Sequence, residues 1–266
     1  MTTHATRGVV VHPDAETLAH AAAARLLTTI LDRLAVQETV HLVLTGGTIG
    51  IKTLAAVATS PVARAVDWSA VHVWWGDERF LPDGDPERNE TLAREALLDG
   101  LDALPAANVH AIPAPGSPGV TTPEDAATAY ARELASCARD TGGAVPVFDV
   151  LLLGMGPDGH VASLFPGHEA LAASGSTVGV HGSPKPPPER VSLTFEAIGA
   201  AREVWLVVAG QDKAPAVERA LAGASREEMW PALDAMWPEY REYERDAGRE
   251  LRMFRLRPVL RAASRP

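Results

Sequence analysis

Short apolar segments that alternate with amphipathic helical segments constrain the fold of this chain more than any other feature of its sequence. Each apolar segment has the length of a buried strand, and a glycine-rich turn follows most of them. Strand, turn and helix repeated in this order predict an α/β fold with a mostly parallel, helix-covered, Rossmann-like sheet. The expected strands are residues 8–12, 40–44, 71–75, 109–112, 148–153 and 204–209. The expected helices begin after Asp14, after Thr48, near Pro123 and near Gln211.

Length and composition indicate one large domain followed by a C-terminal extension. The chain has 266 residues, of which 46% are hydrophobic, and this is enough to bury a substantial core. We expect residues 1–225 to form the α/β domain, with residues 174–190, rich in Pro and Gly, leaving it as an extended excursion. Residues 226–266 are rich in Arg and weakly patterned, so they are expected to form a divergent, charged and partly disordered extension.

The bulk properties argue against several classes of protein. A net charge of −10 disfavours a nucleic-acid surface, because a phosphate backbone needs clustered cations. The lone Cys137 excludes an intrachain disulfide, fits a reducing compartment, and lies in a helical pattern that favours packing over catalysis. The chain shows no apolar signal core at its start and no run of about 18 apolar residues that could span a bilayer. We therefore expect a cytoplasmic protein without nucleic-acid or membrane partners, and the oligomeric state is left open.

Nearly all the unusual polar residues lie in four turns, each at the carboxyl end of an expected strand. The carboxyl ends of parallel strands share one edge of a sheet, and open α/β sheets bind their ligands there. We therefore expect the four turns to form one site. They comprise residues 45–50, residues 74–79 with Asn89 downstream, residues 154–167 and residues 209–213.

Two of the turns have features of a phosphate site. Gly46, Gly47 and Thr48 stand between a strand and a helix, where backbone N–H groups can point at an anion and the helix adds its positive end. A tight turn without a ligand is the alternative. Lys213 stands at the start of a helix, against the helix dipole, so it is either a solvated residue or one held there to meet an anion.

The turn after the third expected strand contains Asp77, Glu78 and Arg79. Arg can grip a phosphate with two hydrogen bonds, while Asp or Glu accepts hydrogen bonds from sugar hydroxyls. The alternative is a salt-bridged turn in which Arg79 pairs with Asp77 or Glu78. Lys185 and Arg190 flank the Pro-rich excursion and can add positive charge, although a cation on a loop more often faces solvent.

His160 is the candidate general base. It follows an apolar strand and a glycine-rich turn, and a His so placed can accept a proton near neutral pH while Asp158 fixes its tautomer. A structural His is the alternative. A dinucleotide fingerprint in the same glycines is disfavoured, because Asp158 and His160 would crowd a pyrophosphate.

Several other kinds of site are not predicted. The nine His residues are scattered, and no His-x-x-x-His or Cys-x-x-Cys pair occurs, so we expect no metal site. The chain also lacks a Gly-x-Ser-x-Gly elbow and a Walker sequence, which disfavours a serine hydrolase and a P-loop enzyme.

Taken together, these turns resemble those of the 6-phosphogluconolactonases, a branch of the glucosamine-6-phosphate isomerase superfamily. The resemblance covers residues 8–225, and from residue 226 onward the match is loose. It is carried by Gly46-Gly47, Trp75 to Arg79 with Asn89, Gly154 to Gly167, Pro184 to Thr194 and Gly210 to Ala214.

The resemblance implies hydrolysis of 6-phospho-D-glucono-1,5-lactone to 6-phosphogluconate in the pentose phosphate pathway, without a metal or an organic cofactor. By this resemblance His160 looks like the residue that activates water, with Asp158 orienting it. Asp77 and Arg79 would help to hold the substrate. The residues implied around the phosphate are Gly46, Gly47, Arg79, Lys213 and Arg190.

Two other functions are possible alternatives. In the related sugar-phosphate isomerases and deaminases, the Asp-Gly-His turn is followed after four residues by a Glu that supports the ring-opening His. Phe165 stands at that place here, and an apolar ring cannot shuttle protons, so the lactonase reading is favoured. A non-catalytic sugar-phosphate sensor would usually carry a DNA-binding module, and an expected first strand at Gly8 leaves little room for one before the domain.

Overall fold

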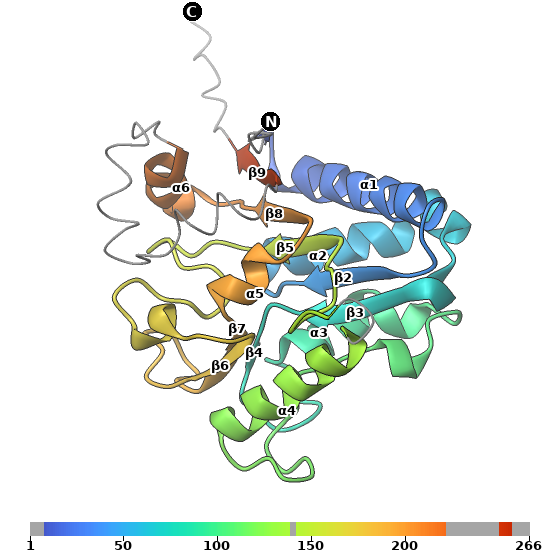
Figure 1. Ribbon diagram of the computed structural model, residues 1–266. Helices are drawn as coiled ribbons and strands as arrows, with labels where there is room; N and C mark the ends of the chain where they lie inside the picture. The colour runs from blue at the N-terminus through green and yellow to red at the C-terminus, as the bar shows by residue number, and fades with distance from the viewer. Residues whose placement is uncertain (1–7, 139–141, 222–249, 257–266) are drawn as a thin grey trace, which may run out of the picture.

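The computed structural model describes residues 8–138, 142–221 and 250–256. Figure 1 shows a central sheet flanked by helices, with a smaller sheet beside it. The predicted α/β fold with a mostly parallel sheet is confirmed. Among the described residues, no helix combines the length and the apolar character needed to cross a membrane.

The central sheet has six strands in the order β1-β9-β8-β5-β2-β3, and every pair in it is parallel. Strands that are buried on both faces read as apolar runs, and all four residues of β5 are indeed buried. The strands are β1 (Gly8–His12), β2 (Val40–Leu44), β3 (Val71–Trp75), β5 (Val150–Leu153), β8 (Glu203–Val207) and β9 (Glu250–Leu256).

The helices are α1 (Ala15–Leu34), α2 (Gly47–Thr59), α3 (Asn89–Ala96), α4 (Pro123–Cys137), α5 (Phe195–Gly199) and α6 (Ala214–Leu221). Local signals define their starts: Asp14 caps α1 by accepting the N–H of Thr17 at 2.7 Å, and Thr122 and Asp125 form a capping box before α4. Helix α1 packs against α2. Helix α4 covers the smaller sheet, and its buried Tyr130 hydrogen-bonds the backbone of Trp75 at the end of β3.

The smaller sheet is antiparallel and consists of β4 (Asp77–Arg79), β7 (Arg190–Leu193) and β6 (Thr177–Val180), in the order β4-β7-β6. Gly76 joins it to the central sheet. The N–H of Gly76 donates to the carbonyl of Leu44 in β2 at 3.0 Å, and the carbonyl of Gly76 accepts the N–H of Leu193 in β7 at 2.8 Å. The Pro-rich excursion thus contains β6 and leads back into β7, which lies against the turn that follows β3.

Two of the predicted elements differ in the structure. Residues 109–112 are not a strand: Val109 forms only an isolated bridge to Val73, because Pro113 and Pro115 follow at once and have no N–H to extend a ladder. Residues 250–256, expected in the extension, form β9 between β1 and β8. The rest of residues 226–266 lies outside the described residues, so the domain boundary at residue 225 stays a prediction.

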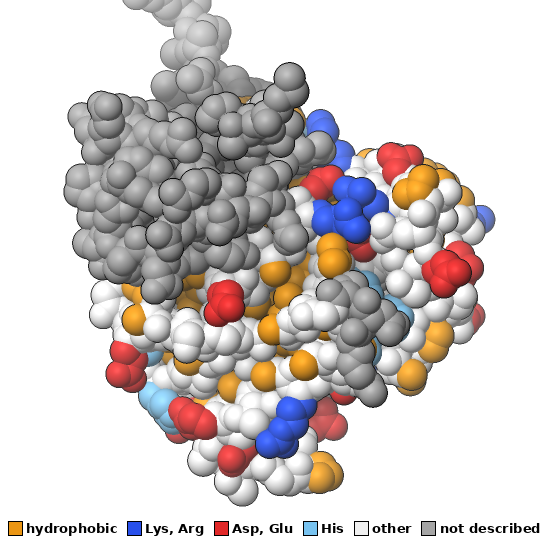
Figure 2. Space-filling view, viewed as in Figure 1, with side chains coloured by type: hydrophobic (Ala, Val, Ile, Leu, Met, Phe, Trp, Pro, Cys, Tyr) orange, Lys and Arg blue, Asp and Glu red, His pale blue; other side chains and the backbone are white. Residues whose placement is uncertain are grey.

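On the face shown in Figure 2, Lys and Arg side chains of the described residues lie among Asp and Glu side chains and form no extended cationic patch. A phosphate backbone requires clustered cations, and this part of the surface does not supply them.

Candidate functional site

The four polar turns follow β2, β3, β5 and β8, which are consecutive neighbours in the order β8-β5-β2-β3. Because these strands are parallel, their carboxyl ends lie along one edge of the sheet. The first and third turns are in direct contact, since Thr45 Oγ1 accepts the N–H of Gly154 at 3.2 Å. The topology therefore brings the predicted site residues to one edge.

The turn after β2 leads directly into helix α2. Gly46 is the N-cap and makes no side-chain capping bond, so the first N–H groups of the helix are not satisfied by a cap. Gly47 has φ +75°, which only glycine adopts readily, and both Gly47 and Thr48 are exposed. Backbone N–H groups at the positive end of a helix can bind an anion.

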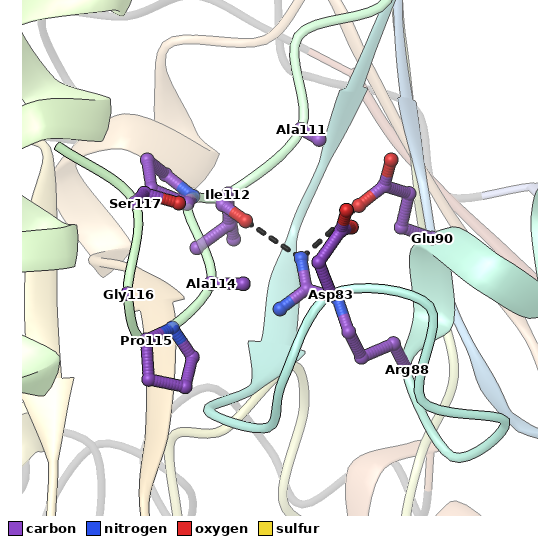
Figure 3. A pocket seen from close by; sticks show the side chains of 10 residues that line it. Asp83, Arg88, Glu90, Ala111, Ile112, Ala114, Pro115, Gly116 and Ser117 are labelled. Atoms are coloured by element: carbon purple, nitrogen blue, oxygen red, sulfur yellow. Dashed lines mark hydrogen bonds and ion pairs between the residues drawn. The ribbon is translucent and has the colours of Figure 1, made fainter.

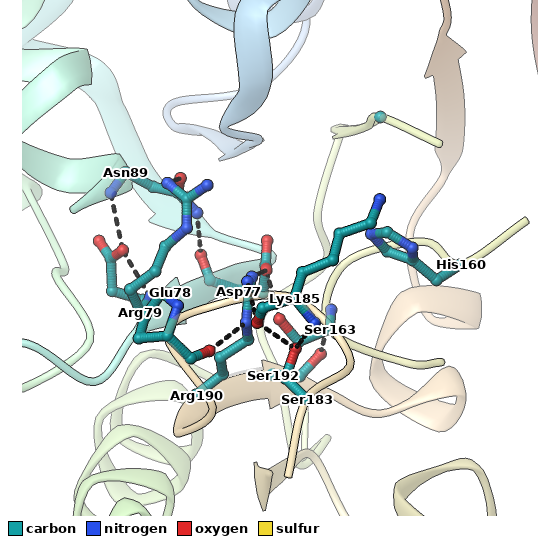
Figure 4. A network of polar contacts seen from close by, with 12 residues as sticks. Asp77, Glu78, Arg79, Asn89, His160, Ser163, Ser183, Lys185, Arg190 and Ser192 are labelled. Carbon is teal, nitrogen blue, oxygen red and sulfur yellow. Dashed lines mark hydrogen bonds and ion pairs between the residues drawn. The ribbon is translucent and has the colours of Figure 1, made fainter. Parts of the chain in front are cut away.

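Asn89 connects the first turn to the second (Figure 4). Its amide nitrogen donates to the carbonyl of Asp77 at 2.8 Å, and its amide oxygen accepts a hydrogen bond from Arg79 Nη1 at 2.7 Å. A Cβ at Gly46 would overlap this amide oxygen. The first turn therefore packs directly on Asn89, and only glycine fits at residue 46.

The Arg79 guanidinium is held from one side. Nη1 donates to Asn89 and to the carbonyl of Glu87 at 2.8 Å, and not to the carboxylates of Asp77 or Glu78. The salt-bridged turn considered above is therefore not what forms. Nε and Nη2 of Arg79 make no hydrogen bond to the described residues, so one edge of the guanidinium is left for a ligand.

Glu78 anchors the second turn to helix α3. Its buried carboxylate accepts the N–H groups of Arg79 at 2.8 Å, Asn89 at 2.7 Å and Glu90 at 2.8 Å, and an Arg88 nitrogen lies 4.0 Å away. Burial nevertheless raises the pKa of Glu78 to about 7. From the sequence, Glu78 was expected either to accept hydrogen bonds from sugar hydroxyls or to pair with Arg79, because nothing in the local pattern shows that it reaches the start of α3.

The Asp77 carboxylate is buried between two further turns. Ser163, from the turn after β5, donates its hydroxyl to Asp77 Oδ2 at 2.6 Å. Arg190 Nη1 lies 4.0 Å from the same oxygen. The register of β4 and β7 sets Asp77 opposite Ser192, so Arg190 is diagonally across from Asp77, two residues along β7. Ser163 was not predicted as a site residue, and its position three residues after His160 was the only available signal.

Arg190 is occupied by the Pro-rich excursion. Its guanidinium donates to the carbonyls of Lys185, Pro186 and Pro187 at 3.1–3.2 Å and lies 5.7 Å from the centre of the Phe165 ring. The structure therefore places Arg190 as a brace between this loop and Asp77. A direct contact with phosphate stays a prediction.

His160 and Asp158 form a close pair. His160 Nδ1 lies 2.6 Å from Asp158 Oδ1, and because an ionised carboxylate only accepts hydrogen bonds, Nδ1 carries the proton and Nε2 keeps its lone pair. A Cβ at Gly156 would overlap the His160 ring, so the glycine leaves the space that the ring occupies. The side chain of His160 is 15% exposed, which leaves a path for substrate.

Burial is the main influence on the pKa of His160 and lowers it, although the hydrogen bond and charge of Asp158 oppose this. The positive charge of Lys185 lowers the pKa further, and Figure 4 shows the Lys185 side chain extending to the His160 ring. The imidazole is therefore neutral at neutral pH, as a general base must be. Lys185 was considered only as a loop cation, and its place beside His160 depends on the folding of the excursion.

Phe165 forms a wall beside the imidazole. It is 2% exposed, and its ring centre lies 4.4 Å from that of His160. The position at which an isomerase would carry a second acid is thus apolar and closed to solvent.

Lys213 ends the short 3₁₀-helix Gln211–Lys213, which follows β8 and precedes α6. This places it at the same edge of the sheet, next to the turn after β5. Among the described residues it forms no hydrogen bond or ion pair with the other predicted site residues, so its role toward phosphate stays a prediction.

A cavity of about 410 Å³ lies on the side of α3 that Arg88 and Glu90 line (Figure 3). It is lined by Asp83, Arg88, Glu90 and residues 111–117. Arg88 crosses it to donate to the carbonyl of Ile112 at 2.7 Å and to Glu90 at 3.1 Å. The cavity contains no predicted site residue, and Arg88 serves there to support the start of α3.

Comparison with known proteins finds relatives of this chain. The chain is 57% identical over 218 residues to a 6-phosphogluconolactonase of Streptomyces coelicolor, covering 81% of this chain and 83% of that protein. It is 44% identical over 217 residues to a 6-phosphogluconolactonase of Mycobacterium tuberculosis, covering 81% and 86%. The solved structure of 6-phosphogluconolactonase from Trypanosoma brucei superposes with a TM-score of 0.74 at 27% identity, covering 95% of this chain and 96% of that one.

The family described as glucosamine-6-phosphate isomerases/6-phosphogluconolactonase matches residues 13–239. This range contains the glycine turn before α2, the Asp77–Asn89 network and the His160–Asp158 pair. The chain therefore belongs to the glucosamine-6-phosphate isomerase/6-phosphogluconolactonase family.

Proposed function

We propose that this protein is a 6-phosphogluconolactonase that hydrolyses 6-phospho-D-glucono-1,5-lactone to 6-phosphogluconate. The observation that carries the proposal is the neutral His160, oriented by Asp158 at 2.6 Å, at the same sheet edge as the helix start at Gly47 and the open side of Arg79. When the substrate phosphate is bound near Gly47 and Arg79, the lactone ring of the same substrate is brought toward the His160 imidazole along this edge of the sheet.

The phosphate binds to the exposed N–H groups at the start of α2 and to the open edge of the Arg79 guanidinium. Helix N-termini and Arg forks both favour phosphate oxygens. Lys213 contributes positive charge from the neighbouring turn. Fixing the phosphate turns the attack on C1 into a reaction between groups already held in place.

The lactone then opens by general-base catalysis. His160 Nε2 takes a proton from a water molecule, and the hydroxide adds to C1 to form a tetrahedral oxyanion. The bond between C1 and the ring oxygen then breaks, and the ring oxygen takes the proton from His160. The carboxylic acid formed at C1 releases a proton to solvent. Asp158 stabilises the imidazolium formed on the way, and the Lys185 ammonium supplies positive charge for the tetrahedral oxyanion.

Isomerisation or deamination of glucosamine 6-phosphate is disfavoured because it requires a second acid near the ring-opening His. Phe165 occupies the position where the relatives of that type carry Glu, and its ring packs 4.4 Å from His160. We expect the hydrolysis to need no metal or organic cofactor. We place the enzyme in the cytoplasm, in the oxidative pentose phosphate pathway, because its substrate is a phosphorylated sugar lactone.

The test is the rate of lactone opening by purified protein compared with the spontaneous rate. His160→Ala should lower kcat by about 10²- to 10⁴-fold, the range that a general base contributes, while circular dichroism stays unchanged. His20→Ala removes an exposed His on α1 and should leave the rate intact. A wild-type rate no higher than the spontaneous one would overturn the proposal, and turnover of glucosamine 6-phosphate would instead favour the isomerase.

A further inference from the structure

Three metal-ligating side chains converge on the side of the molecule where α4 ends. They are His110, Glu133 and Cys137, and their candidate ligand atoms all lie within 4.8 Å of one another. His110 Nδ1 is 2.9 Å from Glu133 Oε1. Glu133 and Cys137 are four residues apart, one turn along α4, so they share a face of the helix. None of the three belongs to the site proposed for hydrolysis.

The His110 ring is held in a fixed orientation. Its Nε2 lies 2.9 Å from Nδ1 of His72, and its ring stacks on Trp74 with centres 3.8 Å apart and planes at 7°. Metal-binding His residues commonly have such a partner on the second nitrogen, which fixes the tautomer and the ring. His110 is also the most buried of the three, with a side chain that is 5% exposed, whereas Glu133 is 51% exposed.

The donor set indicates which cation fits. Imidazole nitrogen, thiolate sulfur and carboxylate oxygen together suit zinc, whereas calcium and magnesium require oxygen ligands. The exposed position of Glu133 gives an ion a path from solvent.

We propose that His110 Nδ1, a Glu133 carboxylate oxygen and Cys137 Sγ bind one zinc-type divalent cation, with water as the fourth ligand. On binding, the Cys137 thiol loses its proton to solvent. His110 Nδ1 releases to solvent the proton that it donates to Glu133 in the metal-free protein. The proton between His72 Nδ1 and His110 Nε2 moves onto His110, and His72 Nε2 takes up a proton from solvent, so both rings stay neutral. The ion joins the end of α4 to the segment that bridges to β3, and so stabilises the fold without entering the reaction.

The sequence alone did not predict this site because His110 is far along the chain from the other two ligands. No His-x-x-x-His or Cys-x-x-Cys pair marks it. The three side chains meet because the last turn of α4 lies against the segment around His110, which bridges to β3.

Cys137 is the only cysteine of the chain, so thiol reactivity reports on this site alone. Untagged protein is treated with chelator and exchanged into buffer, and Cys137 is then alkylated with and without one equivalent of Zn²⁺. We expect zinc to slow alkylation by at least about tenfold, because a metal-bound thiolate is withdrawn from reaction. With Co²⁺ we expect a sulfur-to-cobalt charge-transfer band that saturates at one equivalent and is absent in Cys137→Ser.

Glu133→Gln is the decisive variant, because the exposed amide can still hydrogen-bond His110 but is a poor metal ligand. It should weaken zinc protection of Cys137 by at least about tenfold, the scale of losing a metal contact, and keep the metal-free lactonase rate. Glu16→Gln is the matched control, since Glu16 pairs with His20 at 3.2 Å on α1 away from any cysteine. Equal alkylation rates with and without zinc, or equal protection in both variants, would overturn the proposal.

Discussion

The two halves of the candidate site are held in different ways. In the binding half, which comprises residues 46–48, 77–79 and Asn89, Glu78 accepts three backbone N–H groups and Asn89 bridges Asp77 and Arg79. In the catalytic half, which comprises residues 156–160 and Phe165, the His160 ring has Asp158 as its hydrogen-bond partner and packs on Phe165. A network of buried hydrogen bonds contributes to the stability of the fold, whereas one partially exposed hydrogen-bonded pair contributes little. Changes in the binding half should therefore alter KM and stability, and changes in the catalytic half should alter kcat alone.

A matched pair of glycine substitutions gives the largest expected effects. Neither Gly46 nor Gly156 has a positive φ, so alanine disturbs only what its Cβ would touch. Gly156→Ala displaces the His160 ring and should lower kcat by about 10²-fold, because a misplacement of about 1 Å has that effect. Steady-state kinetics and a melting curve measure both quantities. A fall in kcat accompanied by a large loss of melting temperature would contradict the separation of the two halves.

Gly46→Ala is the counterpart in the binding half. Its Cβ displaces Asn89, which releases Arg79 Nη1 and the Asp77 carbonyl. We expect a higher KM and a loss of about 1–3 kcal/mol in the free energy of unfolding, typical of overpacking in a closely packed region. Denaturant unfolding and steady-state kinetics test this. An unchanged KM would show that Asn89 does not position the substrate.

Arg79→Ala removes the main side-chain contact proposed for phosphate. A hydrogen bond to a charged group contributes about 1.5–3 kcal/mol, which corresponds to a rise in KM of about 10- to 100-fold. The change in kcat should be smaller, because phosphate is bound equally in the ground and transition states. Arg64→Ala, an exposed arginine after α2, serves as the charge control. Equal KM values for the two variants would remove Arg79 from the binding role.

Glu78 gives the binding half a pH-dependent stability. Its pKa in the folded protein is about 7, raised by burial from an ordinary value of 4.5, so the folded state holds this proton more tightly than the unfolded state. Its contribution to stability is therefore full below about pH 4.5 and is lost as the pH rises through about 7. The melting temperature of the wild type relative to Glu78→Gln should fall between pH 5 and pH 8. A difference that stays constant or rises over this range would show that the three N–H bonds hold the carboxylate ionised.

The sequence predicts the fold well where its signals are local. Apolar runs and glycine turns are local features, and they place five of the six central strands and the candidate base His160. Strand β9 was missed because its pairing with β1 and β8 depends on partners far away in the chain. The inner contacts of Glu78, Ser163 and Lys185 were missed for the same reason, since each reaches across to another turn or strand.

Lys185→Met should have the smallest effect and concerns the catalytic half. The Lys185 ammonium lowers the pKa of His160, second to burial among the influences that lower it, so removing this charge should raise that pKa. Catalysis needs the neutral imidazole, and the acid limb of the kcat/KM profile should then move to higher pH, by less than about one unit for an exposed cation screened by water. Arg79→Ala removes a charge of the same sign from the binding half and should leave the limb in place. If both variants moved the limb equally, the two halves would form one electrostatic unit rather than two, and His160 would depend on the whole edge of the sheet for its protonation state.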